Sequence, residues 1–169
     1  MIITAGKYKG RKLFSPDEHI SRPTLSKIRM GVFNSLYSIL GDFENKSFLD
    51  LFGGSGIMGL EALSRGFMSV KVYELNRKSA EIINKNYSLL GLSANLNIGD
   101  SINLLDKSDE YFDVVYIDPP YSSDLYNAAL EKINCNIAIL ESSIEFNFKN
   151  YNIIKQKKYG NTYITFLSK

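Results

Sequence analysis

Five short apolar runs alternate with segments of helical spacing through the middle of the chain, and this pattern predicts its architecture. The runs have the length of strands, whereas the segments between them repeat apolar residues every three or four positions. Such alternation is typical of a mostly parallel sheet with helices on both faces. The predicted strands cover residues 47–51, 70–74, 95–98, 114–117 and 137–140, and the predicted helices cover 57–65, 77–90, 101–106 and 124–134.

The two ends of the chain depart from this alternation. Apolar runs at 153–154 and 162–167 have no helix between them, which predicts an antiparallel pair at one edge of the sheet. Near the N-terminus, the runs 2–5 and 11–14 flank a segment with two glycines and predict a short hairpin. The expected fold class is therefore α/β, a doubly wound, mostly parallel, seven-stranded Rossmann-like sheet with an antiparallel edge strand and an N-terminal hairpin extension.

One amphipathic helix precedes the first strand of the sheet. Thr24 is its expected N-cap, and an apolar stripe continues to about Leu40. No repeat or Pro/Gly/Ser-rich linker divides the sequence. We therefore expect one domain over residues 23–169, preceded by a basic extension over residues 1–22.

Composition narrows the kinds of chemistry that the chain can carry. At 169 residues and 44% hydrophobic, the sequence is long and apolar enough for one full core. No apolar run reaches the roughly 18 residues of a membrane span, and the first residues are too short for a secretory leader, so we expect a cytoplasmic protein and a monomer. A single cysteine and a single histidine exclude an intrachain disulfide and argue against a metal site. Cys135 lies in an apolar stretch and is expected to be a small buried residue.

Charge is unevenly distributed along the chain. Residues 1–30 carry seven Lys/Arg and two acids, residues 31–148 carry eight and sixteen, and residues 149–169 carry five lysines and no acid. The basic ends would form one phosphate-binding surface if they met in space.

A glycine-rich loop follows the first strand and has two interpretations. Gly54, Gly56 and Gly59 spell G-x-G-x-x-G, and Glu74 lies twenty residues after Gly54 at the end of the second strand. This is the dinucleotide fingerprint, in which the acid holds ribose hydroxyls, so a nicotinamide-dependent oxidoreductase is one hypothesis. Backbone N–H groups after the glycines can approach a ligand closely.

The residues before the glycines favour a different nucleoside cofactor. Asp50 and Phe52 precede Gly53, Gly54 and Gly56 in a D-x-F-x-G-x-G pattern that methyltransferases use to hold the amino-acid end of S-adenosylmethionine. No separate substrate domain fits within the 169 residues, which further disfavours the oxidoreductase.

Asp100 follows the third strand and also has two possible roles. Its carboxylate could accept a hydrogen bond from an adenine amino group, or it could cap the helix that begins at residue 101. The two roles are compatible, because a carboxylate has two oxygens.

The fourth strand ends in Asp118-Pro119-Pro120-Tyr121, and this segment indicates amine methylation. The prolines lack N–H groups and hold the preceding backbone extended, so carbonyl oxygens are presented as rigid acceptors. An exocyclic base amine could donate one N–H to Asp118 and the other to such a carbonyl, leaving its lone pair aimed at the sulfonium methyl group. Tyr121 offers a face on which the base can stack. A base inside a duplex could not reach this site, so the target must be looped or flipped out.

Taken together, these motifs resemble the RsmD family of bacterial 16S rRNA guanine-N2 methyltransferases, and the resemblance runs nearly end to end. The N-terminal 6–13 stretch is similar to the family's G-x-x-[RK]-G-R-x-L opening, and Arg22-Pro23-Thr24 with Arg29 is similar to its R-P-T and following arginine. Residues 49–56 and 59–66 match L-D-x-F-x-G-S-G and G-x-E-A-x-S-R-G. The resemblance implies a methyltransferase sheet, S-adenosylmethionine as methyl donor with S-adenosylhomocysteine as product, no metal, and guanine N2 in 16S rRNA, within an assembling or assembled small subunit, as acceptor.

The expected RNA-binding residues come from the basic N-terminal segment and from the resemblance. Lys7, Lys9, Arg11 and Lys12 are expected to contact RNA, and the resemblance implies that Arg22 and Arg29 close over cofactor or RNA. A DNA adenine-N6 methyltransferase uses similar acid-Pro-Pro-aromatic chemistry and stays an alternative, although a separate target-recognition domain does not fit in the chain.

Overall fold

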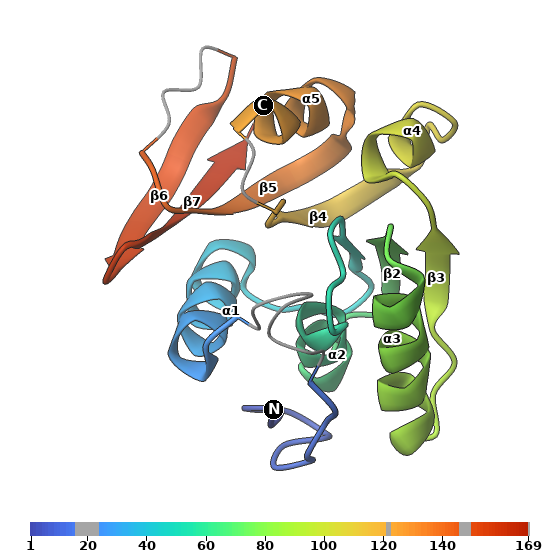
Figure 1. Ribbon diagram of the computed structural model, residues 1–169. Coiled ribbons are helices and arrows are strands. Elements are labelled where there is room, and N and C mark those ends of the chain that lie inside the picture. The colour runs from blue at the N-terminus through green and yellow to red at the C-terminus, as the bar shows by residue number, and fades with distance from the viewer. Residues whose placement is uncertain (16–23, 121–122, 146–149, 169) are drawn as a thin grey trace.

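The computed structural model describes residues 1–15, 24–120, 123–145 and 150–168. Its centre is a seven-stranded sheet of order β3-β2-β1-β4-β5-β7-β6 (Figure 1). The first five strands in the chain run parallel, and each lies within one to three residues of its predicted position. The bounds are β1 Ser47–Asp50, β2 Ser69–Glu74, β3 Asn95–Ile98, β4 Tyr111–Ile117, β5 Asn134–Ser142, β6 Asn152–Tyr159 and β7 Thr162–Ser168.

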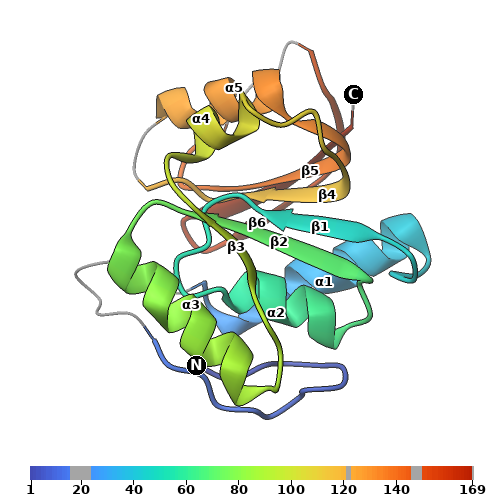
Figure 2. The ribbon, with the colours of Figure 1, turned by 90° about the vertical axis from the view of Figure 1, so that its right-hand side faces the viewer.

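Helices cover both faces of this sheet, as the alternating pattern predicts. One face is covered by α1, α2 and α3 and the other by α4 and α5, with the sheet between the two layers (Figure 2). The order β3-β2-β1-β4 places a switch of direction between β1 and β4, where ligands of doubly wound sheets bind beyond the carboxyl ends of the strands. The helix bounds are α1 Ser26–Leu40, α2 Ile57–Ser64, α3 Arg77–Leu89, α4 Ser101–Leu105 and α5 Ser123–Lys132.

The last two strands form the predicted antiparallel pair, so the expected fold class is confirmed. Strand β7 is the one that runs against β5, and β6 continues the sheet outward as its edge. Because β7 is reversed, its first residues lie beside the last residues of β5, and Tyr163 pairs with Ser142. The turn between β6 and β7 therefore lies at the same edge of the sheet as the carboxyl ends of β4 and β5.

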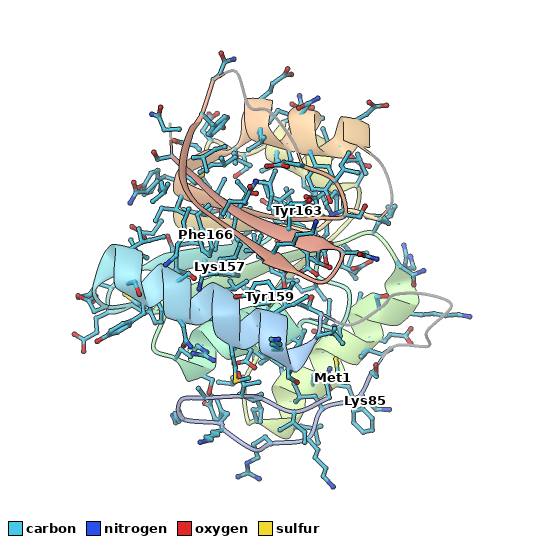
Figure 3. All side chains as sticks on the ribbon, turned by 90° about the vertical axis from the view of Figure 1, so that its left-hand side faces the viewer. Met1, Lys85, Lys157, Tyr159, Tyr163 and Phe166 are labelled. Atoms are coloured by element: carbon cyan, nitrogen blue, oxygen red, sulfur yellow. The ribbon has the colours of Figure 1, made fainter. Side chains whose placement is uncertain are left out.

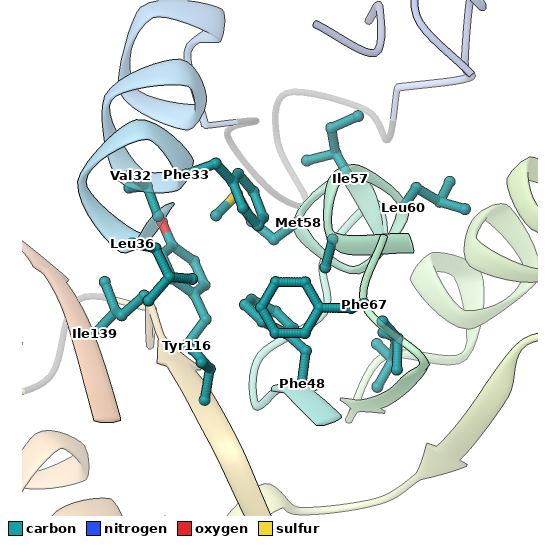
Figure 4. Packing of buried hydrophobic residues seen from close by; sticks show 14 of the residues in the cluster. Val32, Phe33, Leu36, Phe48, Ile57, Met58, Leu60, Phe67, Tyr116 and Ile139 are labelled. Atoms are coloured by element: carbon teal, nitrogen blue, oxygen red, sulfur yellow. The ribbon is translucent and has the colours of Figure 1, made fainter. Parts of the chain in front are cut away.

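Aromatic side chains make the centre of the larger core, between the sheet and helices α1 and α2 (Figure 4). Phe33 of α1 stacks on Phe48 of β1 at 6.0 Å between ring centroids, and Phe67 stacks on Phe43 at 4.7 Å. These rings bring together residues from before, within and after the first strand. The face of the sheet that carries Phe48 is thereby closed to water, and the chemistry is left to the strand ends.

The start of α1 differs from the prediction. The N-cap position is Leu25, which makes no side-chain capping bond, so the prediction that Thr24 caps this helix is wrong. The Thr24 carbonyl accepts a hydrogen bond from the Arg29 guanidinium. The Thr24 carbonyl is held by Arg29 instead, and the helix begins one residue later than a Thr24 cap would place it.

The N-terminal segment lies against α2 and α3. Ile2 and Lys12 form an antiparallel bridge, and Ile3 is buried in the same core as α1 and α2. The Lys7 N–H donates to the carbonyl of Ser64 at 2.7 Å, at the last residue of α2. Figure 2 shows this segment passing beneath α2 and α3, and at Phe14 it bonds the Asn86 side chain of α3, which also donates to the Ser55 carbonyl of the glycine loop.

Candidate active site

Asp50 lies at the carboxyl end of β1 beneath the glycine loop and is only 2% exposed. Its Oδ2 accepts the Gly59 N–H at 3.3 Å. Burial raises the pKa of this carboxyl to about 8, against the lowering effect of the Gly59 N–H, and the charge of Glu74 raises it further. The loop above it turns through left-handed backbone at Gly54 and Gly56, which L side chains rarely adopt.

Glu74 lies at the end of β2 and connects to the same loop. Its Oε2 accepts the Gly54 N–H and its Oε1 accepts the Asn76 N–H, both at 2.7 Å. Burial raises its pKa, and the backbone N–H groups of Asn76, Gly54 and Leu75 oppose that rise. A carboxylate retains further lone pairs after these two bonds, so Glu74 can still accept hydrogen bonds from a ligand.

Asp100 follows β3 and caps α4, which confirms one of its two expected roles. Its Oδ1 accepts the Asn103 N–H at 2.9 Å. The carboxylate stands at the same strand edge as Glu74, because β2 and β3 are paired in parallel with Glu74 opposite Ile98. Contact of Asp100 with a ligand stays a prediction.

Asp118 follows β4, next to β1 in the sheet, and is half-buried. Burial raises its pKa well above the usual range of a carboxyl, and the charges of Glu141 and Asp50 raise it further. Pro119 is buried and Pro120 is exposed, so the two prolines span the boundary between core and surface. Tyr121, the expected stacking residue, lies outside the described residues.

Glu141, near the end of β5, lies in this candidate site and was not among the predicted site residues. Its Oε2 accepts a hydrogen bond from the Tyr116 hydroxyl, and its carbonyl accepts one from the Tyr126 hydroxyl at 2.6 Å. Burial raises the pKa of Tyr116 well above its usual value, and the charges of Glu141 and Asp118 add to the rise. The signal for Glu141 was present in the sequence, since it is an acid that ends an apolar run, as Asp118 does.

Arg29 does not lie where the resemblance implied. Its side chain is 2% exposed and its Nε contacts Glu61 Oε1 at 3.2 Å. The rest of the guanidinium donates to the carbonyls of Thr24 and Ile2 and to the Ser26 hydroxyl. Every group of this side chain that could bind phosphate is thus engaged inside the protein, and the expectation that Arg29 contacts cofactor or RNA is wrong for this structure.

Glu61 is the centre of the buried ion cluster that holds Arg29. The acid is fully buried, and it also bonds Arg65 Nε at 3.1 Å and the N–H and hydroxyl of Thr4 at 2.8 and 2.9 Å. The cluster joins the N-terminal segment, α1 and α2. Nothing in the local pattern of the sequence indicated that these charges would be buried together.

Of the other expected RNA-binding residues, four lie in the described part of the chain and one does not. Lys7, Lys9, Arg11 and Lys12 are exposed, and Arg22 lies outside the described residues. Lys7 is next to the C-terminal end of α2, whereas the glycine loop precedes the N-terminal end of that helix. Lys7 therefore lies at the far end of α2 from the glycine loop, and not beside Asp118.

A hollow of about 620 Å³ lies away from the carboxylates at the strand ends. Its walls come from the N-terminal segment, the C-terminal part of α1 and the turn before β1, including Ala5, Asn34, Tyr37, Asp42 and Arg65. None of the residues of the glycine loop or the Asp118 segment lines it, so it is separate from the expected chemistry.

Two further features of the described part of the chain concern metals and membranes. No three His, Cys, Asp or Glu side chains there are grouped so that they could hold a metal ion. Among the described helices, none has both the length and the apolar character needed to cross a membrane. Cys135 is buried in strand β5, as its apolar surroundings predict.

Comparison with known proteins identifies relatives over nearly the whole chain. The model of the family described as conserved hypothetical protein 95 matches residues 1–168. Ribosomal RNA small subunit methyltransferase D of Escherichia coli K12 is 31% identical over 135 residues, covering 79% of this chain and 67% of the relative. The protein of the same name from Haemophilus influenzae is 35% identical over 133 residues, covering 76% of this chain and 67% of the relative.

Solved structures of similar proteins agree with the fold. That of yhhF from Escherichia coli has a TM-score of 0.84 at 26% identity and covers 100% of this chain and 97% of its own. The structure of SMU.776, solved in complex with SAH, has a TM-score of 0.62 at 14% identity and covers 85% of this chain and 48% of its own. The second similarity is one of fold.

Proposed function

The chain belongs to the RsmD family, and we propose on this basis that it transfers a methyl group from S-adenosylmethionine to the exocyclic N2 amine of a guanine in 16S rRNA. The names of its relatives support methylation of small-subunit rRNA. The observation that carries the proposal is the half-buried Asp118 carboxyl, which follows the end of β4. It is close enough to Asp50, which lies beneath the glycine loop, for the charge of Asp50 to raise its pKa.

The charge of the site supports a cationic cofactor over a dinucleotide. The pKa values of Asp50, Glu74 and Asp118 are all raised, and only backbone N–H groups act to lower the pKa of Asp50 and Glu74. A pyrophosphate would add negative charge beside these acids, whereas a ligand with ammonium and sulfonium groups would be attracted by their ionised forms. The residues present therefore fit S-adenosylmethionine better than a nicotinamide dinucleotide.

Each side of the cofactor has a candidate partner among the expected residues. Glu74 would accept hydrogen bonds from ribose hydroxyls, and Asp100 would accept one from the adenine amino group. Asp50, Phe52 and the backbone of Gly53, Gly54 and Gly56 would hold the amino-acid end. When bound, S-adenosylmethionine supplies a methyl group activated by its positively charged sulfur.

Asp118 would orient the acceptor amine and stabilise its developing positive charge. Its carboxylate can accept one N–H of the amine while a carbonyl at Pro119 accepts the other, which fixes the direction of the nitrogen lone pair. The methylated amine is strongly acidic and loses its proton readily, so no dedicated general base is required. Tyr121 would stack on the base, which must leave its helix to reach the strand edge.

We assign this chemistry to residues 23–169 and regard residues 1–22 as an N-terminal extension. The proposed substrate is 16S rRNA within an assembling or assembled small subunit, which places the enzyme in the cytoplasm. A monomer suffices, because one chain carries all of the expected site residues.

The test uses small ribosomal subunits that lack the methyl mark. The purified protein with labelled S-adenosylmethionine is expected to transfer one methyl group per particle, and mass spectrometry of the rRNA should place it on guanine N2. Transfer to duplex DNA alone would favour the adenine methyltransferase, and calorimetric binding of NAD(P) in place of S-adenosylmethionine would favour an oxidoreductase.

A substitution connects this activity to Asp118. Asp118→Ala is expected to abolish turnover while S-adenosylmethionine still binds. The matched control is Asp109→Ala, which removes an exposed acid between α4 and β4 and should leave turnover unchanged. Retained activity in Asp118→Ala would contradict the role given to this carboxylate.

A further inference from the structure

The hairpin of β6 and β7 carries lysines to the edge of the sheet where the carboxylates lie. Glu141 of β5 pairs with Ile164 of β7, and Ile164 pairs in turn with Lys157 of β6. Adjacent strands lie about 4.8 Å apart, so the backbone of Lys157 is roughly 10 Å from that of Glu141, in the same row of the sheet. The next row connects Ser142 to Lys158 in the same way, through Tyr163.

The two lysines lie on opposite faces of this edge, because successive residues of a strand alternate. Lys157 shares the face of Glu141 and Ile164 and lies over α1 (Figure 3). Lys158 lies on the other face, where its Nζ donates to the Tyr163 hydroxyl at 2.8 Å and is 4.7 Å from the centre of that ring. The described part of the hairpin, residues 150–168, contains three lysines and no acid. The hydrogen bond to Tyr163 raises the pKa of Lys158, and the charge of Glu145, which follows β5, adds to the rise.

The hairpin is braced against α1 through Tyr159. A Cβ atom built at Gly31 of α1 would lie 2.0 Å from the Tyr159 hydroxyl, so the ring packs directly on the helix backbone there. Tyr159 also packs against the main core. The lysines are therefore presented from a supported element and not from a free loop.

Lys7 of the N-terminal segment is less well placed for a substrate at Asp118. Under the proposed function, Glu74 and Asp100 hold the cofactor at the β2 and β3 half of the edge, which leaves the β4, β5 and β7 half for the acceptor. Lys7 binds through its N–H at the last residue of α2, an eight-residue helix about 12 Å long that begins at the glycine loop. Lys7 thus lies at the far end of α2 from the glycine loop.

We propose that Lys157 and Lys158 of the β6–β7 hairpin bind the phosphates that flank the target nucleotide of the substrate RNA. This proposal rests on the proposed function, since it takes an RNA base at Asp118 as its starting point. A base turned out into the strand edge must bring its neighbouring phosphates close to the protein, and lysines on both faces of the adjoining hairpin can neutralise them. Tyr163, half-buried beneath Lys158, holds that ammonium group at the edge.

The test compares two double variants that remove equal charge. Lys157→Gln/Lys158→Gln changes the hairpin, and Lys85→Gln/Lys107→Gln changes two exposed lysines, one on α3 and one in the turn after α4. Filter binding to 16S rRNA is measured across a salt series, and S-adenosylmethionine binding serves as the check on folding. The hairpin variant is expected to lose affinity on the order of tenfold, with the salt slope reduced by about 1 per lost phosphate contact, while the control stays within about twofold of the wild type.

The outcomes separate this proposal from the proposed function. An equal or larger loss in the control variant, or wild-type affinity and slope in the hairpin variant, would overturn the assignment of the phosphates to the hairpin. The binding measurement does not require turnover, so failure of the wild type to methylate small subunits would refute the function and leave the comparison of the two variants readable. In an active enzyme, the hairpin variant should raise KM for the subunit far more than it lowers kcat.

Discussion

Asp50→Asn should change how the stability of the protein depends on pH. The carboxyl is buried at the end of β1, and its pKa stands at about 8 against an ordinary value of 3.8. Between these values the unfolded chain releases the Asp50 proton and the folded chain keeps it. The free energy of unfolding of the wild type therefore falls as pH rises through this window, and the contribution of the group is lost fully only above the folded pKa.

The size of the effect follows from the slope of proton linkage. One proton retained in the folded state changes the free energy of unfolding by about 1.4 kcal/mol per pH unit. Between pH 5 and pH 7 the wild type should lose on the order of 3 kcal/mol through Asp50 alone. Asparagine does not titrate, and its side-chain oxygen can still accept the Gly59 N–H, so the variant should lack this loss.

The assay is urea unfolding followed by circular dichroism at pH 5, 6 and 7. The stability of Asp50→Asn relative to the wild type is expected to rise across the series by roughly 3 kcal/mol. Asp109→Asn, an exposed acid, should give a curve parallel to the wild type. A stability difference that does not change with pH would refute the argument that Asp50 is buried with its proton.

Two other substitutions test the interior on which the site depends. Arg29→Met leaves the buried Glu61 carboxylate with one arginine fewer and should lower the free energy of unfolding in urea by about 3 kcal/mol. At temperatures well below its Tm, the variant should keep its RNA affinity. A loss of RNA affinity in the folded variant would show that Arg29 contacts RNA. Gly59→Ala places a Cβ 2.6 Å from the Tyr87 hydroxyl and should cost about 1–3 kcal/mol. Since that buried hydroxyl has no hydrogen-bond partner among the described residues, adding Tyr87→Phe should recover part of the loss, and no recovery would place the clash elsewhere.

Most of the fold could be predicted from spacing because its elements are strongly periodic. The strands of a doubly wound sheet are buried on both faces and appear as short apolar runs, and the helices between them are amphipathic. The differences from the prediction lie where tertiary contacts set the ends of a strand. Strand β4 begins at Tyr111 and β5 extends to Ser142, beyond the apolar runs at 114–117 and 137–140, because their neighbours in the sheet continue the pairing.

The candidate site was predicted only where its chemistry is local. The glycine loop and the Asp118 segment each place several informative residues within a few positions, and the structure brings Asp50 and Asp118 together through the pairing of β1 with β4. Glu141 was missed because it is a single acid at the end of an apolar run, with no motif residues beside it. It joins the site only because β5 lies beside β4 and aims the Glu141 carboxylate at Tyr116.

The sequence by itself determined the fold class and the strand ends at which the candidate residues lie, and it predicted that the Asp118-Pro119-Pro120-Tyr121 segment binds an amine. Only the tertiary structure decided which charges are used inside the protein and which face a substrate. Arg29 and Lys157 are both cations on amphipathic or alternating elements, and no local pattern separates them. The first is buried against Glu61, and the second reaches the edge of the sheet. The physical reason is that periodicity depends on neighbours in sequence, whereas the environment of a charge depends on the strands and helices that pack around it.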